Sequence, residues 1–333
     1  MITDARALRP EYLPRELHHR EGPIQHLTAV LKPLSQGYSA ENILLTGPSG
    51  AGKTTLARYV VERLEAQTLA VRSGYVNAMS ESTAVSLLYR LLRETGLGAD
   101  LRPEGIPQGE YLSRVRASDD ELVWIIDEVD VVTEPALLEA LYEQPNLTLL
   151  MVTVDHNDLL SSVDQRVASR LRSAEHVRLE KYTHDELVDI LSHRADAGLK
   201  PGSVPEDLLS QIAETAAGDA RLGIALLRQA ARHADREGGK RLSTGLLREI
   251  ESEARDDVEN LQVAHLSTHQ RHLFDLIREH RNLSAGDLHE LYEGRVRAPK
   301  SKRTRRRYLD SLERYDLIEK RGAKRSTRYV YER

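Results

Sequence analysis

A glycine-rich octapeptide near residue 50 limits what this chain can fold into more than any other feature. It reads Gly47-Pro48-Ser49-Gly50-Ala51-Gly52-Lys53-Thr54. A mostly apolar run, residues 42–45, comes just before it, and an amphipathic run, residues 55–61, comes directly after it. The sequence therefore predicts a strand, a glycine-rich loop and a helix in succession. Such a loop turns several backbone N–H groups toward one anion, and the start of the helix adds positive potential there.

The residue types within the octapeptide predict a nucleoside triphosphate with Mg²⁺ as the ligand. The three glycines allow the backbone to approach phosphate oxygens closely. Lys53 is long enough to reach the β- and γ-phosphates, and the Thr54 hydroxyl is a ligand for Mg²⁺. The expected nucleotide-binding segment comprises Gly47, Pro48, Ser49, Gly50, Ala51, Gly52, Lys53, Thr54 and Thr55.

A second strand is expected to carry two carboxylates to the same site. The apolar run 122–126 is followed by Asp127 and Glu128. Parallel strands bring their C-terminal ends to one edge of a sheet, where ligands bind. We expect Asp127 to hold Mg²⁺ together with Thr54, and Glu128 to polarise the attacking water as general base. Lys53, Asp127 and Glu128 are therefore catalytic candidates for ATP hydrolysis.

Composition restricts the class of protein. Apolar residues make up 40% of the chain and charged residues 30%, which is typical of a globular protein with substantial cores. The chain has no cysteine, so disulfides, thiolate nucleophiles and cysteine-bound metal centres are excluded. The N-terminal residues lack the apolar core of a signal peptide, and the longest apolar stretch, residues 147–154, is too short to span a bilayer. We expect a cytoplasmic, nucleoid-associated protein with no membrane partner.

The order of the expected elements indicates three domains. Apolar runs alternate with helical patterns up to residue 178, which predicts an α/β domain with a parallel sheet covered by helices on both faces. Residues 183–257 are helical throughout. We expect a nucleotide-binding domain over residues 1–178, a helical lid domain over 179–258 and a third domain over 259–333. The expected strands of the first domain are 42–46, 69–77, 122–127, 147–154 and 176–179.

The third domain is predicted to be a winged helix with a basic surface. Helical patterns near 268–280, 285–292 and 301–315 precede two strand-like runs, 316–320 and 327–331. Residues 261–333 hold 18 Lys and Arg against 10 Asp and Glu, so they carry +8 while the first 260 residues carry −13. The third helix begins with a cationic turn, as a recognition helix in the major groove of DNA does. The DNA-binding candidates are Lys302, Arg303, Arg305, Arg306 and Arg307 in this helix and Lys324 and Arg325 in the turn between the strands.

Together these motifs resemble those of AAA+ ATPases, and two further segments fit that superfamily. Residues 218–227 are similar to the lid segment called sensor 2, whose arginine touches the γ-phosphate. The resemblance implies that Arg221 contacts the nucleotide of its own subunit. Residues 164–171 resemble the helix that presents an arginine finger to a neighbouring subunit. We expect Arg170 rather than Arg166 to be that finger; the alternative is a charged surface helix.

More narrowly, the chain resembles, from end to end, the origin-recognition-complex and cell-division-cycle family of AAA+ replication initiators in its archaeal form. Residues 12–21 match the N-terminal signature that lies beside the adenine in that family, which implies nucleotide contacts for Tyr12, Pro14 and Arg20. The resemblance weakens at sensor 1, where the family places an asparagine near the γ-phosphate. Asn157 is the candidate for this role, and Asp155 is the alternative register.

The resemblance implies an ATP-controlled protein that binds origin duplex DNA, associates with further copies on DNA and helps recruit the replicative helicase. The expected cofactors are ATP or ADP and Mg²⁺, and hydrolysis is expected to be slow and switch-like. One alternative is a Holliday-junction branch-migration motor of similar length, although residues 127–130 lack the histidine-containing continuation typical of those motors. The other is an initiator paralogue that acts as a DNA-binding regulator.

Overall fold

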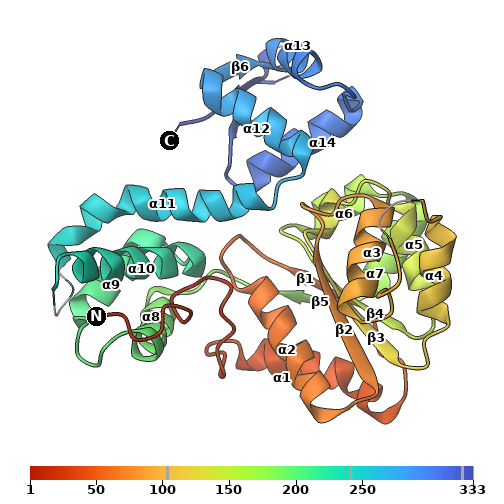
Figure 1. Ribbon diagram of the computed structural model, residues 1–333, viewed down its shortest axis with the longest axis horizontal. Coiled ribbons are helices and arrows are strands. Elements are labelled where there is room, and N and C mark those ends of the chain that lie inside the picture. Colours follow the sequence, from red (N-terminus) through yellow and green to blue (C-terminus); the bar gives the residue numbers. More distant parts are fainter. Residues whose placement is uncertain (103–104, 240–241, 243, 324–325, 333) are drawn as a thin grey trace.

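The chain folds into three parts that follow one another in sequence (Figure 1). The computed structural model describes residues 1–102, 105–239, 242, 244–323 and 326–332. A parallel sheet with helices on both faces is followed by a group of helices and then by a smaller domain of helices and short strands. The order of these parts agrees with the order expected from the sequence.

A five-stranded parallel sheet is the centre of the first domain, and its strand order is β2-β3-β4-β1-β5. All five expected strands are present, and the fold prediction is confirmed. Every residue of β1 and β4 is buried, because both lie inside the sheet with helices on each face. The strands are β1 (Ile43–Thr46), β2 (Val71–Asn77), β3 (Glu121–Asp127), β4 (Leu147–Val152) and β5 (Glu175–Arg178).

Alternating side chains of β3 divide the core of this domain into two layers. Leu122, Trp124 and Ile126 face one layer, and Val123 and Ile125 face the other. The alternation follows from the pleat of a strand, which points successive side chains to opposite faces. The helices and 3₁₀ turns of this domain are α1 (Glu21–Leu31), η1 (Lys32–Gln36), α2 (Lys53–Gln67), α3 (Ala84–Glu94), α4 (Gln108–Arg116), η2 (Val129–Val131), α5 (Ala136–Tyr142), α6 (His156–Ser162) and α7 (Gln165–Ser173).

The lid domain is helical, as expected, but it also contains the N-terminus of the chain. Leu8 is 1% exposed and belongs to the apolar core of the lid, and Ile2 pairs with Leu199 across an isolated bridge. Residues 1–8 therefore pack with the lid rather than with the sheet, which differs from the expected boundary of 1–178. The elements of the lid are α8 (His184–Gly198), α9 (Glu206–Ala216), α10 (Ala220–Arg236), η3 (Thr244–Leu246) and α11 (Leu247–Ala264).

The helix α11 joins the lid to the C-terminal domain without a break. Its Asp257 accepts hydrogen bonds from Arg228 and Gln229 of α10, at 2.8 and 2.5 Å, and its last turn lies beside the C-terminal domain (Figure 1). The expected boundary at 258 and 259 thus falls inside a continuous helix. None of the described helices, α11 included, is long and apolar enough to cross a membrane.

The C-terminal domain has the order of elements expected of a winged helix. Three helices surround an apolar core, and three short antiparallel strands pair in the order β6-β8-β7. The strand expected over residues 316–320 begins only at Glu319, as β7. Asp316 has a left-handed backbone, with φ 57°, and Leu317 and Ile318 are buried in the core. The elements are α12 (Thr268–His280), β6 (Asn282–Ser284), α13 (Ala285–Arg295), α14 (Lys302–Arg314), β7 (Glu319–Arg321) and β8 (Arg328–Val330).

Candidate nucleotide-binding site

The predicted glycine-rich loop lies between the end of β1 and the first residue of α2, Lys53. Three of its glycines have positive φ: Gly47 at 143°, Gly50 at 74° and Gly52 at 85°. A Cβ atom on Gly47 would lie 2.2 Å from the Leu179 carbonyl oxygen, and one on Gly50 would lie 2.1 Å from Asp219 Oδ1. The loop therefore needs glycine at both positions, for its backbone angles and for the close approach of neighbouring segments.

A cavity of about 620 Å³ opens beside this loop and is shared by all three domains. The sheet domain contributes the loop, β2 and β3; the lid contributes α8 and α10; and the end of α11 and the C-terminal domain close one side. The cavity is lined by these expected site residues: Tyr12, Pro14, Gly50, Gly52, Lys53, Thr54, Thr55, Asp127, Glu128 and Arg221. Gly47, Pro48, Ser49 and Ala51 belong to the loop but do not line the cavity.

Thr54 and Asp127 meet at the floor of the cavity. The Thr54 hydroxyl donates a hydrogen bond of 2.7 Å to Asp127 Oδ2, and the Tyr75 hydroxyl donates one of 3.1 Å to the same oxygen. A hydroxyl and a carboxylate oxygen side by side are the kind of ligands that Mg²⁺ prefers. The residues at this point therefore fit a magnesium ion.

Lys53 rests on the loop that contains it. Its Nζ donates hydrogen bonds to the carbonyl oxygens of Gly47 and Pro48, at 2.7 and 2.9 Å. The residue is buried, and burial lowers the pKa of its ammonium, while the nearby carboxylates of Glu128 and Asp127 oppose that shift. Phosphate oxygens are stronger acceptors than peptide carbonyls, so a bound triphosphate has a cation already in place.

Glu128 has an unusual backbone and an unusual environment. Its φ of 57° is left-handed, and the residue follows directly after β3. Burial raises its pKa to about 8, and the charges of Asp127 and Asp130 act in the same direction, whereas Lys53 and a hydrogen bond from Tyr315 oppose it. The Tyr315 hydroxyl donates this bond to Glu128 Oε2. The sequence contained no signal for this contact, because the two residues are 187 positions apart.

The first turn of α10 brings the expected sensor 2 arginine to the cavity. Asp219 caps the helix by accepting hydrogen bonds from the backbone N–H groups of Arg221 and Leu222, at 2.8 and 3.1 Å. The Ala220 N–H donates to the Gly50 carbonyl at 3.2 Å, which ties the lid to the glycine-rich loop. Arg221 lines the cavity from the lid side.

The N-terminal signature contributes to the site in two different ways. Tyr12 and Pro14 line the cavity, and Arg194 of α8 holds this segment by donating to the carbonyl oxygens of Ala7 and Tyr12, at 3.1 and 3.0 Å. Arg20, in contrast, does not line the cavity, which corrects the expected nucleotide contact. It is 7% exposed and lies beneath the loop.

Arg20 is a positioning residue rather than a nucleotide ligand. Its guanidinium donates to the carbonyl oxygens of His19, Ala51 and Glu180, at 3.0, 3.0 and 2.9 Å. It also stacks over the ring of Tyr182, with 3.8 Å between the guanidinium carbon and the ring centroid. One buried cation thus joins the glycine-rich loop to the segment that leads into the lid.

The segment expected to form sensor 1 is arranged differently from both expectations, Asn157 and Asp155. Asp155 caps α6 by accepting from the N–H groups of Asn157 and Asp158, at 2.7 and 3.0 Å, and neither Asp155 nor Asn157 lines the cavity. The sensor 1 role of Asn157 therefore stays a prediction. Thr153, which directly follows β4, is fully buried and donates a hydrogen bond of 2.8 Å to Asp130 Oδ1.

The expected arginine finger lies outside the cavity. Arg170 is in α7, its side chain is 40% exposed, and its Nη2 lies 3.7 Å from Glu143 Oε1. Arg166 of the same helix is exposed. Their positions do not let either residue contact the nucleotide of its own subunit, so a role for Arg170 toward a neighbouring subunit stays a prediction.

Two family models match the chain and agree with this geometry. An AAA domain matches residues 36–163, and a Cdc6 AAA+ ATPase-type lid domain matches residues 188–251. The first match covers the glycine-rich loop and the two carboxylates at the end of β3, and the second covers the lid that carries Arg221. The fold and the site thus define an AAA+ ATPase with a lid of the Cdc6 type.

Individual relatives show to which family of AAA+ ATPases the chain belongs. The chain is 38% identical over 330 residues to ORC1-type DNA replication protein 9 of Halobacterium salinarum, covering 99% of this chain and 93% of that protein. It is 38% identical over 304 residues to ORC1-type DNA replication protein 1 of the same organism, covering 91% and 99%. The structure of the Aeropyrum pernix ORC1 protein in complex with DNA superposes with a TM-score of 0.73 at 27% identity, over 99% of this chain and 92% of that one. The chain belongs to the family of ORC1-type DNA replication proteins.

Substitutions in the cavity should separate ATP binding from hydrolysis. We predict that Lys53→Ala loses ATP binding, because it removes the cation that faces the phosphates. Glu128→Gln should bind ATP as the unmodified protein does but hydrolyse it roughly 100-fold or more slowly, because it removes the general base. Filter binding of labelled ATP and phosphate release measure the two effects. Lys32→Ala, at an exposed lysine of η1, is the control, and equal ATP affinity of the Lys53 variant and that control would refute the assignment.

Substitution of Arg20 should destabilise the glycine-rich loop, although Arg20 does not line the nucleotide cavity. We predict that Arg20→Ala lowers the free energy of unfolding by about 2–3 kcal/mol, because three buried or partly buried hydrogen bonds to a charged donor are lost. ATP affinity should fall as well, since the loop loses its support. Arg20→Lys should recover part of the stability. Urea unfolding and ATP titration measure both quantities, and unfolding equal to that of the unmodified protein would contradict the positioning role.

Proposed function

We propose that this chain is an ATP-controlled initiator of DNA replication that recognises origin duplex DNA and helps to recruit the replicative helicase. The observation that carries the proposal is the exposed cationic end of α14, in a basic C-terminal domain that is joined directly to an ATPase site. The ORC1 relative of A. pernix, which superposes over nearly the whole chain, is in complex with DNA in its solved structure. This supports DNA as the partner of the same surface here.

The start of α14 has the properties of a DNA-reading element. Ser301 caps the helix by accepting from the Thr304 N–H at 3.2 Å, and Lys302, Arg303 and Arg306 are exposed. These three cations form no ion pair within the described part of the chain. The N-terminal residues of a recognition helix enter the major groove, where a bidentate arginine reads guanine. Lys302, Arg303 and Arg306 are accordingly the proposed DNA contacts.

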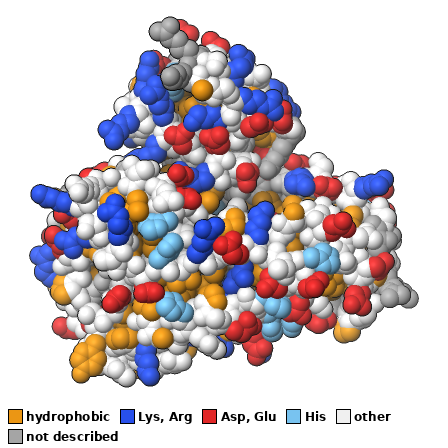
Figure 2. Space-filling model, turned by 180° about the vertical axis from the view of Figure 1, so that it is seen from behind, with side chains coloured by type: hydrophobic (Ala, Val, Ile, Leu, Met, Phe, Trp, Pro, Cys, Tyr) orange, Lys and Arg blue, Asp and Glu red, His pale blue; other side chains and the backbone are white. Residues whose placement is uncertain are grey.

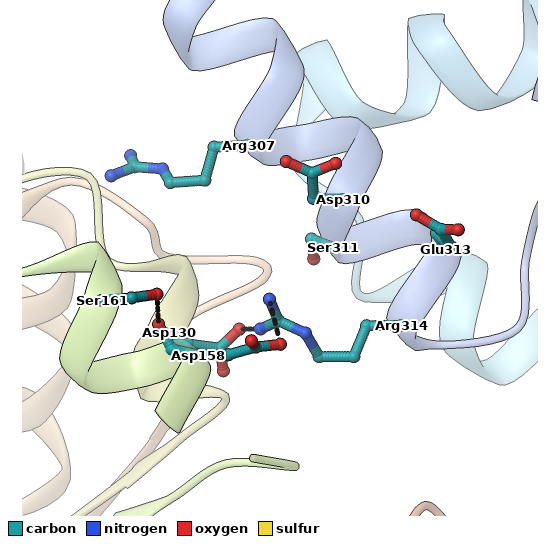
Figure 3. Close-up of a pocket in the computed structure, with 8 residues that line it drawn as sticks. All are labelled: Asp130, Asp158, Ser161, Arg307, Asp310, Ser311, Glu313 and Arg314. Carbon is teal, nitrogen blue, oxygen red and sulfur yellow. Dashed lines mark hydrogen bonds and ion pairs between the residues drawn. The ribbon is translucent and has the colours of Figure 1, made fainter. Parts of the chain in front are cut away.

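Two of the expected DNA-binding residues point elsewhere. Arg305 is 3% exposed, pairs with Glu293 at 2.6 Å and donates to the His289 carbonyl at 3.1 Å, so its guanidinium is used inside the domain. Arg307 lines a cleft between α14 and the sheet domain and reaches across that cleft toward α6 (Figure 3). We therefore do not include Arg305 and Arg307 among the proposed DNA contacts. Lys324 and Arg325 lie outside the described residues and stay DNA-binding candidates on charge alone.

The charge of the C-terminal domain agrees with the proposal. Figure 2 shows Lys and Arg side chains over the upper lobe, which is the C-terminal domain. Contacts between cations and phosphates supply most of the affinity of proteins for duplex DNA, and a few base contacts supply specificity. A domain that combines dispersed cations with one exposed helix end provides both kinds of contact.

The ATP site is proposed to act as a switch for DNA binding. Thr54 and Asp127 would hold Mg²⁺, which neutralises charge on the phosphates when it is bound. Lys53 and Arg221 would bind the phosphates from the loop and from the lid, and Glu128 would take a proton from the attacking water. Tyr12 and Pro14 would pack beside the base of ATP or ADP.

The initiator and the two alternatives differ in where the protein binds on the genome. We predict that immunoprecipitation of the protein with its bound DNA enriches one or a few intergenic sites at which replication begins. A branch-migration motor would instead form hexameric rings on junctions, and a regulatory paralogue would bind sites at which replication does not begin. Mapping of replication start sites in the same cells distinguishes these outcomes.

Substitutions in α14 should distinguish base contacts from buried arginines. We predict that Arg303→Ala or Arg306→Ala weakens binding to the specific duplex by about 1–3 kcal/mol and affects random duplex much less, as expected for a contact to guanine. Arg255→Ala, at an exposed arginine of α11, is the matched control and should leave both affinities unchanged. Fluorescence anisotropy on specific and scrambled duplexes measures the difference. If both α14 variants bind every duplex as tightly as the unmodified protein does, the proposed DNA interface is wrong.

Self-association on DNA would bring Arg170 to the ATP site of a neighbouring copy. We predict that Arg170→Ala slows hydrolysis only at protein concentrations at which subunits associate, whereas Arg221→Ala slows it at every concentration. Arg166→Ala is the control from the same helix. Phosphate release over a dilution series separates the two behaviours, and an Arg170 defect that persists in the monomer would disprove the role in a neighbouring subunit.

A further inference from the structure

The far end of α14 touches the ATPase site. Tyr315, the residue after this helix, donates a hydrogen bond to Glu128 Oε2. Arg314 pairs through Nη1 with Asp130 Oδ2, and its Nη2 lies 3.4 Å from Asp158 Oδ2. Figure 3 shows the Arg314 side chain reaching from α14 across the cleft to these two carboxylates. The C-terminal domain thus contacts the very segment that carries the proposed general base.

This contact is a packed interface and not a loose surface pair. The Asp130 side chain is 3% exposed and Arg314 is 20% exposed. Met79 and Val131 of the sheet domain are buried within the apolar core of the C-terminal domain. Val131 belongs to η2, which begins one residue after Glu128. The position of α14 and the position of Glu128 are therefore linked through a short, buried segment.

The hydrogen bond from Tyr315 occupies an oxygen that catalysis needs. A general base must bring a carboxylate oxygen within hydrogen-bond reach of the attacking water. In this structure Oε2 of Glu128 accepts the Tyr315 hydroxyl instead, and the Tyr315 ring forms part of the cavity wall. We propose that Tyr315 and Arg314, together called the α14 latch, hold Glu128 and Asp130 and restrain ATP hydrolysis until the C-terminal domain moves.

The faces of α14 show how movement would be transmitted. Arg305, Tyr308, Leu309 and Leu312 recur at helical spacing and are buried in the domain. Arg307, Asp310, Ser311 and Arg314 recur at the same spacing and line the cleft. The exposed cations at the start of the helix lie about 12–18 Å along its axis from Arg314, at about 1.5 Å per residue. A helix is stiff over this length, so a shift of its cationic end on DNA displaces the latch at its other end.

The lid is also connected to Tyr315. Gln262, in the last turn of α11, donates a hydrogen bond of 3.2 Å to the Tyr315 carbonyl. Because α11 packs along α10, the helix of Arg221, movement of the lid on nucleotide also reaches Tyr315. A buried ion pair has little net worth, since the cost of removing both charges from water offsets their attraction. The Arg314–Asp130 pair can therefore open and close reversibly.

The latch rests on the proposed DNA-binding function, and removal of one hydroxyl group tests it. We predict that Tyr315→Phe raises hydrolysis without DNA by about fivefold, the size expected from loss of one hydrogen bond. Affinity for the specific duplex without nucleotide should not fall, because a bond that DNA binding would have to break is already absent. Tyr329→Phe removes a hydroxyl from a buried tyrosine of the same domain that does not line the nucleotide cavity, and it should hydrolyse ATP at the unmodified rate. A purely structural hydroxyl would lower the melting temperature and would not raise the rate, so an unchanged or lower rate overturns the proposal.

A reversible cross-link tests the movement itself. The chain has no cysteine, so Ser161→Cys and Asp310→Cys introduce two thiols, one on α6 and one on α14, among the residues that line the cleft (Figure 3). We predict that a bifunctional disulfide-forming reagent bridging them keeps hydrolysis at the DNA-free rate when specific duplex is added. A reducing agent should restore the faster rate. DNA that accelerates the cross-linked protein as much as the reduced protein would overturn the latch.

The two proposals fail in different ways. If the protein binds no duplex DNA in anisotropy, the proposed function fails, whatever the rate of the Tyr315 variant. If it binds specific DNA but Tyr315→Phe hydrolyses like the Tyr329 variant, the latch fails and the proposed function stands. Single cysteine variants treated with the same reagent control for modification of the thiols alone.

Discussion

The hydrogen bond between Thr54 and Asp127 is the point on which the rest of the site depends. It joins the first turn of α2 to the end of β3 over 2.7 Å, although the two residues are 73 positions apart. The strand order makes this meeting unavoidable, because β4 alone separates β1 from β3 in the sheet. Lys53 precedes Thr54 and Glu128 follows Asp127, so the four groups proposed to act on ATP come from two segments of the chain. The lid and the C-terminal domain are then arranged around this fixed centre.

Local motifs could be predicted from the sequence because their geometry is set by neighbouring residues. The glycine-rich loop, the carboxylates after β3 and the capped start of α10 each need only a few consecutive residues, and each lies where it was expected. Arg305 shows a signal that was present but not used. It precedes Tyr308, Leu309 and Leu312 by three, four and seven positions, so helical periodicity already placed it on the buried face of α14.

Contacts between distant segments could not be predicted in this way. Arg20 supports the loop through carbonyl groups 31 and 160 positions away, whereas its place in the N-terminal signature implied a nucleotide contact. Asn157 was the candidate at the point where the family resemblance weakens, and its backbone N–H donates to Asp155 in the cap of α6. Tyr315 reaches Glu128 only because α11 and the core of the C-terminal domain bring α14 back onto the sheet domain. A single sequence contains no record of such placement, because many positions of a domain on a linker satisfy the same apolar pattern.

We propose that nucleotide binding and DNA binding are coupled through α14 and α11. Coupling between two ligands is reciprocal, so each must change the affinity of the other by the same factor. Calorimetry with a non-hydrolysable ATP analogue and the specific duplex, each titrated with and without the other, measures both factors on one protein. The account predicts that the two factors are equal and differ from one, and that Tyr315→Phe brings both closer to one. Affinities for the analogue and for the duplex that do not depend on each other would contradict it.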